Sequence, residues 1–384
     1  MFLTMGLHRL RMHLANIRRL GVKELWSLWR DPVMLFLILY TFTVAVYTSG
    51  TAMPETLSQT PIAIVDEDDS ALSARITGAF YPPAFLPPVR ITHAEVDALL
   101  DAGHYTLVLV IPPGLQRDVL AGRQPTLQLN VDATRMSQAF AGSGLVQQIV
   151  AGEVAEFAQR HRAVQAPPVE LVPRMRFNPT LSNVWFGSLM ELVGQITMVS
   201  IILTGAALIR EREHGTVEHL LVMPVTPTEI MLAKVGAMGL VVLLAAVLSM
   251  RGIILGALRV PVDGSLWLFF GGAALHLFAT TSMGIFMATL ARNMPQFGLL
   301  VMLVMMPLEM LSGGMTPRES MPTWVQWAMS LAPTTHFTEL SQAILYRGAG
   351  LAVVWPSLLA LALIGSVLFA LSLRRFRRAI AQMA

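Results

Sequence analysis

Cysteine is absent from this chain of 384 residues, so disulfides, thiol catalysis and thiolate metal sites are excluded. Charged residues are also scarce, at 13% against 54% hydrophobic residues, and the mean hydropathy is +0.60. Soluble domains carry roughly 25% charged residues, so this composition indicates a membrane protein. Lysine occurs only at Lys23 and Lys234. The remaining positive charge is on arginine and is therefore permanent.

A nucleotide-binding loop is missing as well. The pattern G-x-x-x-x-G-K-[ST] places its lysine directly after glycine and before serine or threonine, and neither Lys23 nor Lys234 has such neighbours. We therefore expect no ATPase activity, no enzyme activity and no cofactor in this chain. If it pumps, the energy comes from a partner. Nucleic acid is not an expected partner.

Six apolar runs predict membrane-crossing helices, at residues 33–49, 185–208, 230–250, 266–290, 297–311 and 351–373. Pro32 suits the first position of the first helix, and Pro307 predicts a kink or break in the fifth. With six spans, the basic segments 1–32, 210–234 and 374–384 all fall on one side. The positive-inside rule makes that side cytoplasmic, together with both termini.

The basic segment 1–32 also has an apolar stripe at helical spacing, which predicts an amphipathic helix along the membrane surface. The stripe consists of Leu7, Leu10, Leu14, Ile17, Leu25 and Leu28. A cleaved signal peptide is the alternative. Against it, the basic region is long and no small-residue cleavage site follows.

Residues 50–182 differ from the rest, because short β-branched runs alternate with helical patterns and predict one external α/β domain between spans one and two. Strands are expected at 62–65, 105–111 and 126–131, and helices at 70–80, 94–100 and 135–162. Thr92 and Glu95 form a capping-box pattern. The acidic run 66–69 lacks the glycine of a calcium loop, since Ala71 stands at the sixth position, and favours a helix cap instead.

A charged segment, residues 209–234, separates the second and third spans and cannot lie in lipid. Pro224 and Pro227 predict the end of its helix and a turn back into the membrane. His214 and His219 are five positions apart, roughly 140° around a helix, so they cannot share a metal as zinc-protease histidines do. An ordinary solvated loop is the plain interpretation of this segment.

The same segment resembles the coupling helix of ABC-2 type exporter permeases, placed here at 210–228. The residues that carry the resemblance are Glu211, Arg212, Glu213, Gly215, Thr216, Glu218, Leu221 and Pro224. The resemblance implies a fold of six transmembrane helices, with residues 183–373 carrying spans two to six and residues 1–32 a connecting helix. It also implies docking of this segment on a separate ATPase subunit that binds the ATP. A departure from the family pattern is Leu-Ala before Lys234, where glycine is usual before the lysine.

Further partners follow from the resemblance rather than from the residues. They are a second permease chain, identical or different, and a periplasmic adaptor protein, with the bacterial inner membrane as location. The implied cargo is small and hydrophobic or amphiphilic. Segment 312–345 resembles the outer re-entrant segment of the family, with an outer gate expected at Gly313, Gly314, Pro317 and Pro322. A plain external loop is the alternative.

Polar residues inside predicted spans are costly and need a role. Glu191, Gln195, His276 and Glu309 are candidates to line one translocation path, and interhelical hydrogen bonding is the alternative. Arg251 is expected to reach the interface or to pair with Glu309. The spacing of glycines 252 and 256 predicts close helix packing.

Two other functions stay open from the sequence. A membrane-anchored receptor or assembly scaffold would act through the external domain. An intramembrane hydrolase would use His276 with Glu191 or Glu309, but no motif supports it.

Overall fold

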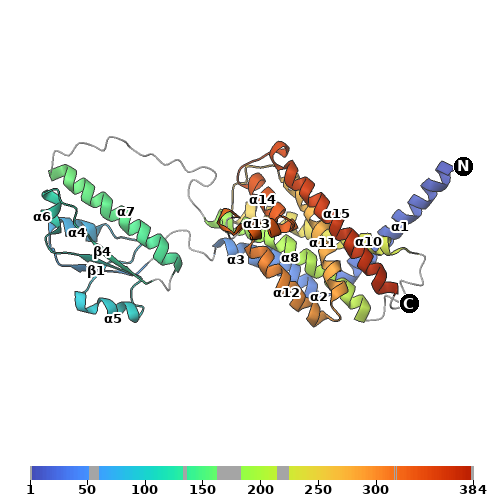
Figure 1. Ribbon diagram of the computed structural model, residues 1–384, viewed down its shortest axis with the longest axis horizontal. Coiled ribbons are helices and arrows are strands. Elements are labelled where there is room, and N and C mark those ends of the chain that lie inside the picture. Colours follow the sequence, from blue (N-terminus) through green and yellow to red (C-terminus); the bar gives the residue numbers. More distant parts are fainter. Residues whose placement is uncertain are drawn as a thin grey trace. The chain divides into compact units, whose positions relative to one another are not determined.

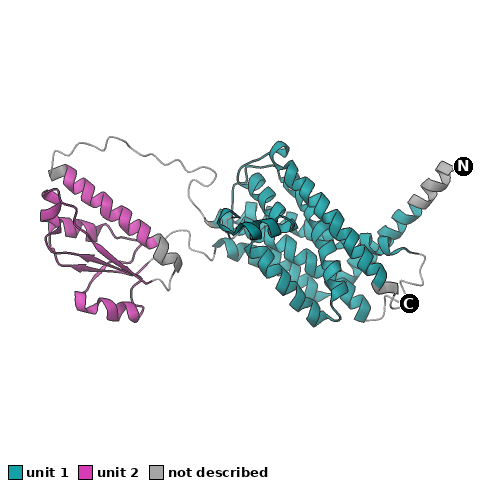
Figure 2. Cartoon of the chain, in the orientation of Figure 1, with its two compact units in different colours: residues 1–53, 175–384 teal, residues 54–174 magenta. Residues whose placement is uncertain are grey.

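The computed structural model describes residues 2–51, 60–132, 136–161, 183–213, 225–314, 316 and 318–381. The chain forms two compact units (Figure 2). Unit 1 consists of Met1–Met53 and Met175–Ala384, and unit 2 of Pro54–Arg174.

Unit 2 contains a four-stranded sheet in the order β2-β1-β3-β4. The strands are β1 (Ile62–Asp66), β2 (Val89–Arg90), β3 (Leu107–Ile111) and β4 (Gln128–Val131). β1 pairs in parallel with both β2 and β3, and β4 is antiparallel to β3. β1 and β3 are continuous apolar runs, as expected for parallel strands covered on both faces.

Helices cover both faces of this sheet (Figure 1). They are α4 (Ala71–Gly78), α5 (Val96–Asp101), α6 (Leu115–Leu120) and α7 (Met136–His161). Because strand side chains alternate, Ile62 and Ile64 pack with α4, α6 and α7, whereas Ala63 and Val65 pack with α5. The predicted capping box is confirmed, with the Thr92 backbone N–H donating to Glu95 at 2.8 Å.

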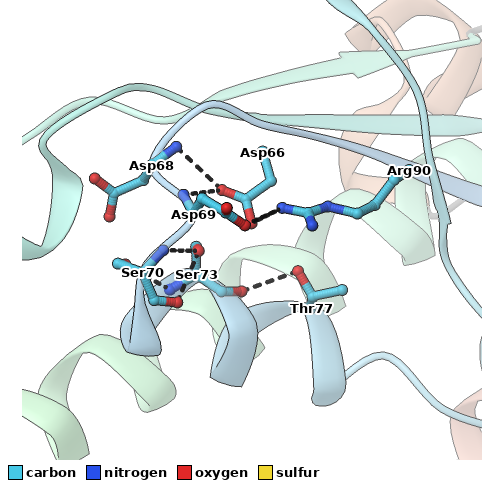
Figure 3. A network of polar contacts seen from close by, with 7 residues as sticks. All are labelled: Asp66, Asp68, Asp69, Ser70, Ser73, Thr77 and Arg90. Carbon is cyan, nitrogen blue, oxygen red and sulfur yellow. Dashed lines mark hydrogen bonds and ion pairs between the residues drawn. The ribbon is translucent and has the colours of Figure 1, made fainter.

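The acidic run 66–69 joins three elements of unit 2. Asp66 accepts from the backbone N–H groups of Asp68 and Asp69, and Arg90 binds Asp66 at 2.7 Å (Figure 3). Asp68 lies on the other side of this turn, where it accepts from the backbone N–H of Gly114 at 2.7 Å at the start of α6. The expected acidic cap therefore serves α6, while α4 is capped by Ser70.

Unit 1 is helical. Its elements are α1 (Phe2–Trp29), α2 (Pro32–Tyr40), a π-helical segment (Thr41–Ala45), α3 (Val46–Thr51), α8 (Asn183–Glu213), α10 (Pro227–Ser249), a second π-helical segment (Met250–Ala257), α11 (Leu266–Leu290), α12 (Met294–Met310), α13 (Thr323–Met329), α14 (Pro333–Leu345) and α15 (Leu351–Ala381). Among the described residues, five helical stretches are long and apolar enough to cross a membrane. They are Pro32–Thr51, Val184–Glu213, Pro227–Ala257, Leu266–Leu290 and Leu351–Arg378, and α12 is a shorter apolar helix.

Pro32 and Pro227 both stand at the first position of a helix, although only Pro32 was expected to. Pro32 begins α2 as predicted, with Asp31 as its N-cap. Pro227 was expected to end a helix, but it begins α10, where Thr226 and Glu229 form a capping box. A proline fits the first helical turn, where its missing N–H is not needed. Of the expected coupling helix 210–228, residues 210–213 therefore belong to α8, residues 227–228 belong to α10, and 214–224 lie outside the described residues.

Two further expectations need correction. The basic residues 374–378 continue α15 to Ala381 instead of starting a separate tail, because arginine is a good helix former and favourable at a helix C-terminus. The glycines at 252 and 256 lie in a π-helical segment, and a Cβ added at Gly252 would meet nothing within 4 Å.

Close helix packing occurs elsewhere, between α8 and α11. A Cβ added at Gly284 would lie 2.6 Å from the carbonyl oxygen of Ile201, and one at Gly205 would lie 2.1 Å from the Phe297 ring. Only glycine leaves room for these backbones to approach so closely. The contact fixes α8, most of whose side chains are buried, against α11 and α12.

Candidate functional site

Helices α1, α8 and α10 contact one another where the charged segment 209–234 leaves α8 and enters α10. On α1, residues 13, 17, 20, 24 and 28 recur at spacings of three or four and form one face of the helix. Leu20 and Leu28 on this face are buried, and so is Glu24, which is only 4% exposed. The face therefore carries a buried charge, which needs a partner.

The partners of Glu24 come from distant parts of the chain. Lys234 on α10 donates to Glu24 at 2.9 Å and lies 2.7 Å from Glu211 on α8. Lys23, next to Glu24 on α1, also binds Glu211. These four residues, which we call the lysine cluster, bring the two lysines of the sequence to the same pair of carboxylates and join three helices.

The two lysines differ in their surroundings. The Lys234 side chain is 2% exposed, whereas that of Lys23 is 44% exposed. Partial burial would lower the pKa of Lys23, but the carboxylates of Glu211 and Glu24 outweigh it and raise this pKa above 10.5. Lys23 is therefore charged at neutral pH, and its charge faces the carboxylates of Glu24 and Glu211.

A second group of contacts joins α1 to the first turn of α10. Glu229 caps α10 through Thr226, and its other oxygen binds both His13 and Asn16 of α1 at 3.0 Å. One buried carboxylate thus orders the start of α10 and holds α1 against it. The position of α1 is therefore fixed by polar contacts as well as by the buried side chains of Leu20 and Leu28.

The end of α8 is bound to further helices by its predicted coupling residues. Arg212 donates to the carbonyl oxygens of Ala288 and Ala291 at 3.2 and 3.0 Å, at the end of α11. Glu213 accepts from the backbone N–H of Met294 at 3.0 Å, at the start of α12. Each charge stabilises the helix end of opposite partial charge. Among the predicted coupling residues, Gly215, Thr216, Glu218 and Leu221 lie outside the described residues.

The polar residues predicted for a path lie near the opposite end of α8. Glu191 and Gln195 on α8 and Glu309 on α12 line one cavity of about 400 Å³, called here the acidic cavity. Gln195 donates to Glu191 at 2.6 Å, as their spacing of one helical turn predicted. Three of the four predicted residues are therefore brought together.

His276, the fourth, does not line this cavity, which corrects the expectation of a common lining. It is fully buried on α11, where its Nε2 lies 2.8 Å from the hydroxyl of Thr197 and its ring stacks on Phe337. Thr197 lines the cavity and stands between it and the histidine. Within the described residues no carboxylate contacts His276, so a histidine–carboxylate hydrolase site is not formed there.

Of the two alternatives expected for Arg251, pairing with Glu309 is not observed. Arg251 is exposed, and no ion pair joins it to Glu309, although both side chains are described. Its position at the end of α10 lets the guanidinium reach solvent or headgroups instead. Among the described residues, no group of three His, Asp or Glu side chains is placed to hold a metal ion.

The predicted gate residues lie beside a second cavity of about 450 Å³, called here the polar cavity. Gly313 and Gly314 line it together with charged side chains, namely Arg318, Glu319, Glu339 and Arg347. Phe186, Ser312, Gly314 and Thr338 line both cavities, so the two adjoin at the glycine turn. Pro322 precedes α13 and lines neither cavity, and Pro317 lies outside the described residues.

Several residues of this site were not singled out from the sequence. They are Glu24, Lys234, Glu229, His13 and Asn16. One signal was available for two of them. A lysine inside a predicted span needs an acidic partner, and Glu24 stands on the same helix face as the buried Leu20 and Leu28.

Three features together define a multi-pass membrane transport permease. The chain has several apolar helices of membrane-crossing length, and polar cavities lie among the helices. The end of α8, where the charged segment begins, is bound to α1, α10, α11 and α12. The chain belongs to the ABC-2 family transporter proteins, whose family model matches residues 31–374. The predicted resemblance is thereby confirmed.

Named relatives agree with this assignment. The chain is 60% identical over 372 residues to the inner membrane transport permease YhhJ of Escherichia coli (strain K12), covering 97% of this chain and all of that protein. It is 29% identical over 360 residues to the probable multidrug ABC transporter permease YbhR of the same organism, covering 93% and 96%. It is 24% identical over 213 residues to ABC transporter G family member 20 of Dictyostelium discoideum, covering 54% and 28%.

Proposed function

We propose that this chain is the membrane-spanning subunit of an ATP-binding cassette exporter, driven by a separate ATPase that docks on the residues following Glu213, up to Leu221. The observation that carries the proposal is the anchorage of the end of α8. Glu211 binds α1 and α10, Arg212 binds the end of α11, and Glu213 binds the start of α12. A displacement of this segment would therefore reach four other helices at once.

This anchorage changes the role assigned to three of the predicted coupling residues. Glu211, Arg212 and Glu213 are already bound within the chain, so in this proposal they transmit force to the bundle. Docking falls to the residues further along, among them Gly215, Thr216, Glu218 and Leu221. The energy and the ATP belong to the partner.

The export route in this proposal uses the acidic and polar cavities. Their junction at Gly313 and Gly314 supports an outer gate there, because a glycine turn between cavities changes conformation at low cost. α12 has 17 residues, or roughly 26 Å at 1.5 Å per residue, and counts as the fifth of six spans. The route carries a small hydrophobic or amphiphilic substrate.

One face of α12 supports a second permease chain, identical or different. The exposed side chains on it are Leu299, Met302, Leu303, Met306 and Met310. Two adjoining cavities, of about 410 and 560 Å³, lie along this helix and are lined largely by methionine and leucine. Methionine adapts to varied partners, which suits the wall of a route shared between two chains.

The proposed orientation places both termini and segment 214–224 in the cytoplasm of a bacterium, and the α/β unit on the opposite side of the inner membrane. Because the chain has no cysteine, single cysteines report on it directly. A cysteine in place of Glu218 is expected to react with an impermeant maleimide only after the inner membrane is opened. A cysteine in place of Glu67 is expected to react in spheroplasts. Labelling of both from the same side contradicts this orientation.

Affinity purification in mild detergent tests the function itself. The exporter subunit should bring down an ATPase, a second permease chain if the two differ, and a periplasmic adaptor if one is used. A receptor or assembly scaffold acting through the α/β unit would bring down no ATPase, and that result would overturn the proposal.

A further inference from the structure

The acidic cavity has hydrogen-bond acceptors without partners, and among the described residues no basic side chain lines its wall. Gln195 is 9% exposed, and because its amide N–H group donates to Glu191, its Oε1 is left without a partner. Thr334 is 4% exposed and its hydroxyl is also without a partner. Both line the cavity together with Glu191 and Glu309.

Three hydroxyl donors in the same wall are already used within the protein. The hydroxyl of Thr197 donates to Val193 O at 3.2 Å, that of Ser312 to Glu309 O at 3.0 Å, and that of Ser49 to Gly187 O at 3.4 Å. The basic side chains of Arg318 and Arg347 line the neighbouring polar cavity, where Glu319 and Glu339 accompany them. The acidic cavity thus offers acceptors and negative charge, and little else that is polar.

We propose that the acidic cavity binds the protonated amine of a cationic amphiphile, with Glu191, Glu309 and Gln195 Oε1 as acceptors. This inference rests on the proposed function and names the substrate class of its route. An ammonium group brings three donors and one positive charge, which matches an amide oxygen and two carboxylates. Hydrogen bonds between ionised partners are about twice as strong as neutral ones.

The rest of the wall suits the hydrocarbon part of such a ligand. Met190, Val193, Met198 and Leu308 line the cavity beside the polar groups. An apolar wall excludes water and strengthens the attraction between the ammonium and the carboxylates. A few polar groups in an apolar cavity are typical of sites that fix the orientation of a small ligand.

The test is equilibrium dialysis of radiolabelled dodecylammonium against the full chain in lipid nanodiscs, with empty nanodiscs to subtract partitioning. Dodecyltrimethylammonium, which has the charge but no N–H donor, and neutral dodecanol serve as competitors. We expect dodecylammonium to bind at least about tenfold more tightly than either competitor, since one hydrogen bond to a charged group changes the affinity by about this factor. This comparison needs no mutation.

Variants then assign the site. Replacing Glu191 and Glu309 together by glutamine is expected to weaken dodecylammonium binding at least about tenfold and to leave dodecanol binding unchanged. Glu67→Gln is the matched control, because Glu67 is exposed in the α/β unit and lines neither cavity. Equal binding of amine and alcohol to the unaltered chain, or full amine binding by the double variant, would overturn the inference.

The measurement is independent of the proposed function, because no ATPase is present. Failure of an ATPase to copurify would remove the exporter and leave the binding site standing. Failure of dodecylammonium to bind would remove the substrate class and leave the exporter standing.

Discussion

The Nζ of Lys234 lies 2.7 Å from Oε2 of Glu211, although the two residues are 23 positions apart and residues 214–226 connect their helices. The same ammonium lies 2.9 Å from Glu24 of α1. These buried contacts join the end of α8 and the first turns of α10 to α1, on both sides of residues 214–226 in the sequence. They are the structural reason to treat α1, α8 and α10 as one mechanical body.

The first prediction concerns this lysine. Lys234→Met leaves two buried carboxylates with only Lys23 as a partner, and removing one member of a buried ion pair costs about 3–5 kcal/mol. We expect a large fall in the midpoint of thermal unfolding, measured on the purified protein in detergent. Lys23→Met is the matched control, because that side chain is 44% exposed and an exposed pair contributes at most about 1 kcal/mol. Equal losses for the two variants would contradict the lysine cluster as described.

The second prediction concerns the contact between α8 and α11. Gly284→Ala places a methyl group 2.6 Å from the Ile201 carbonyl oxygen, so the helices must separate, at a cost of about 1–3 kcal/mol. Gly271→Ala is the control on the same helix, because its Cβ would meet nothing within 4 Å. It should be neutral or stabilising by up to about 1 kcal/mol. Thermal unfolding of both variants decides the matter, and an unaffected Gly284→Ala would refute the close approach.

The third prediction separates the two gate glycines. Gly313 has φ of +94°, in the region that favours glycine, so Gly313→Ala should cost about 1–2 kcal/mol. At Gly314 no such φ occurs, and an added Cβ would meet Met190 at 3.6 Å, an ordinary contact. Gly314→Ala should therefore be tolerated. Thermal unfolding of the two variants side by side is the measurement, and the reverse order would show that this turn is built differently.

The fourth prediction is a pH dependence in the α/β unit. Partial burial raises the pKa of Asp68, but hydrogen bonds from Ser70 and from the backbone N–H groups of Gln116, Gly114 and Leu115 outweigh it and hold this pKa below 3.8. A lowered native pKa means that the ionised group stabilises the fold above about pH 4, and that this stability is lost as the pH falls below that value.

Hydrogen exchange of the α6 amides in the full chain measures this effect. At pH 7 the α6 amides should exchange faster in Asp68→Asn than in the unaltered chain. The difference between the two exchange rates should shrink as the pH falls below about 4. Glu67→Gln, at an exposed neighbour, corrects for the intrinsic pH dependence and should change nothing. A difference that persists at low pH would show that Asp68 acts by shape and not by charge.

The sequence was sufficient for elements defined by local pattern. The apolar run 266–290 has the bounds of α11, and the strands and helices predicted for unit 2 begin within a few residues of β1, β3, β4, α4, α5 and α7, whereas β2 and α6 were not predicted. Apolar length, period-two alternation and capping residues act over a few positions, so they can be read without a structure. Pro227 shows the limit, since a proline marks either the end of one helix or the start of the next.

The site was less accessible from sequence because its contacts are long-range. Glu191 and Gln195 share a helix turn and were paired correctly, but the lysine cluster joins residues about 210 positions apart. His276 was expected to share a lining with Glu191, Gln195 and Glu309, yet its rotation on α11 turns it toward Thr197 and Phe337. Rotation about a helix axis depends on packing against neighbours, which a nearly all-apolar span does not encode in its pattern.

We propose that a separate ATPase drives this chain by docking on the residues that follow the end of α8, where the lysine cluster holds Glu211. The most direct measurement is ATP turnover by the copurified complex, comparing the unaltered chain with Glu218→Arg and with Glu67→Arg in the α/β unit as control. We expect Glu218→Arg to abolish either association of the ATPase or its dependence on the permease, and Glu67→Arg to change neither. Unchanged association and turnover in Glu218→Arg would contradict it.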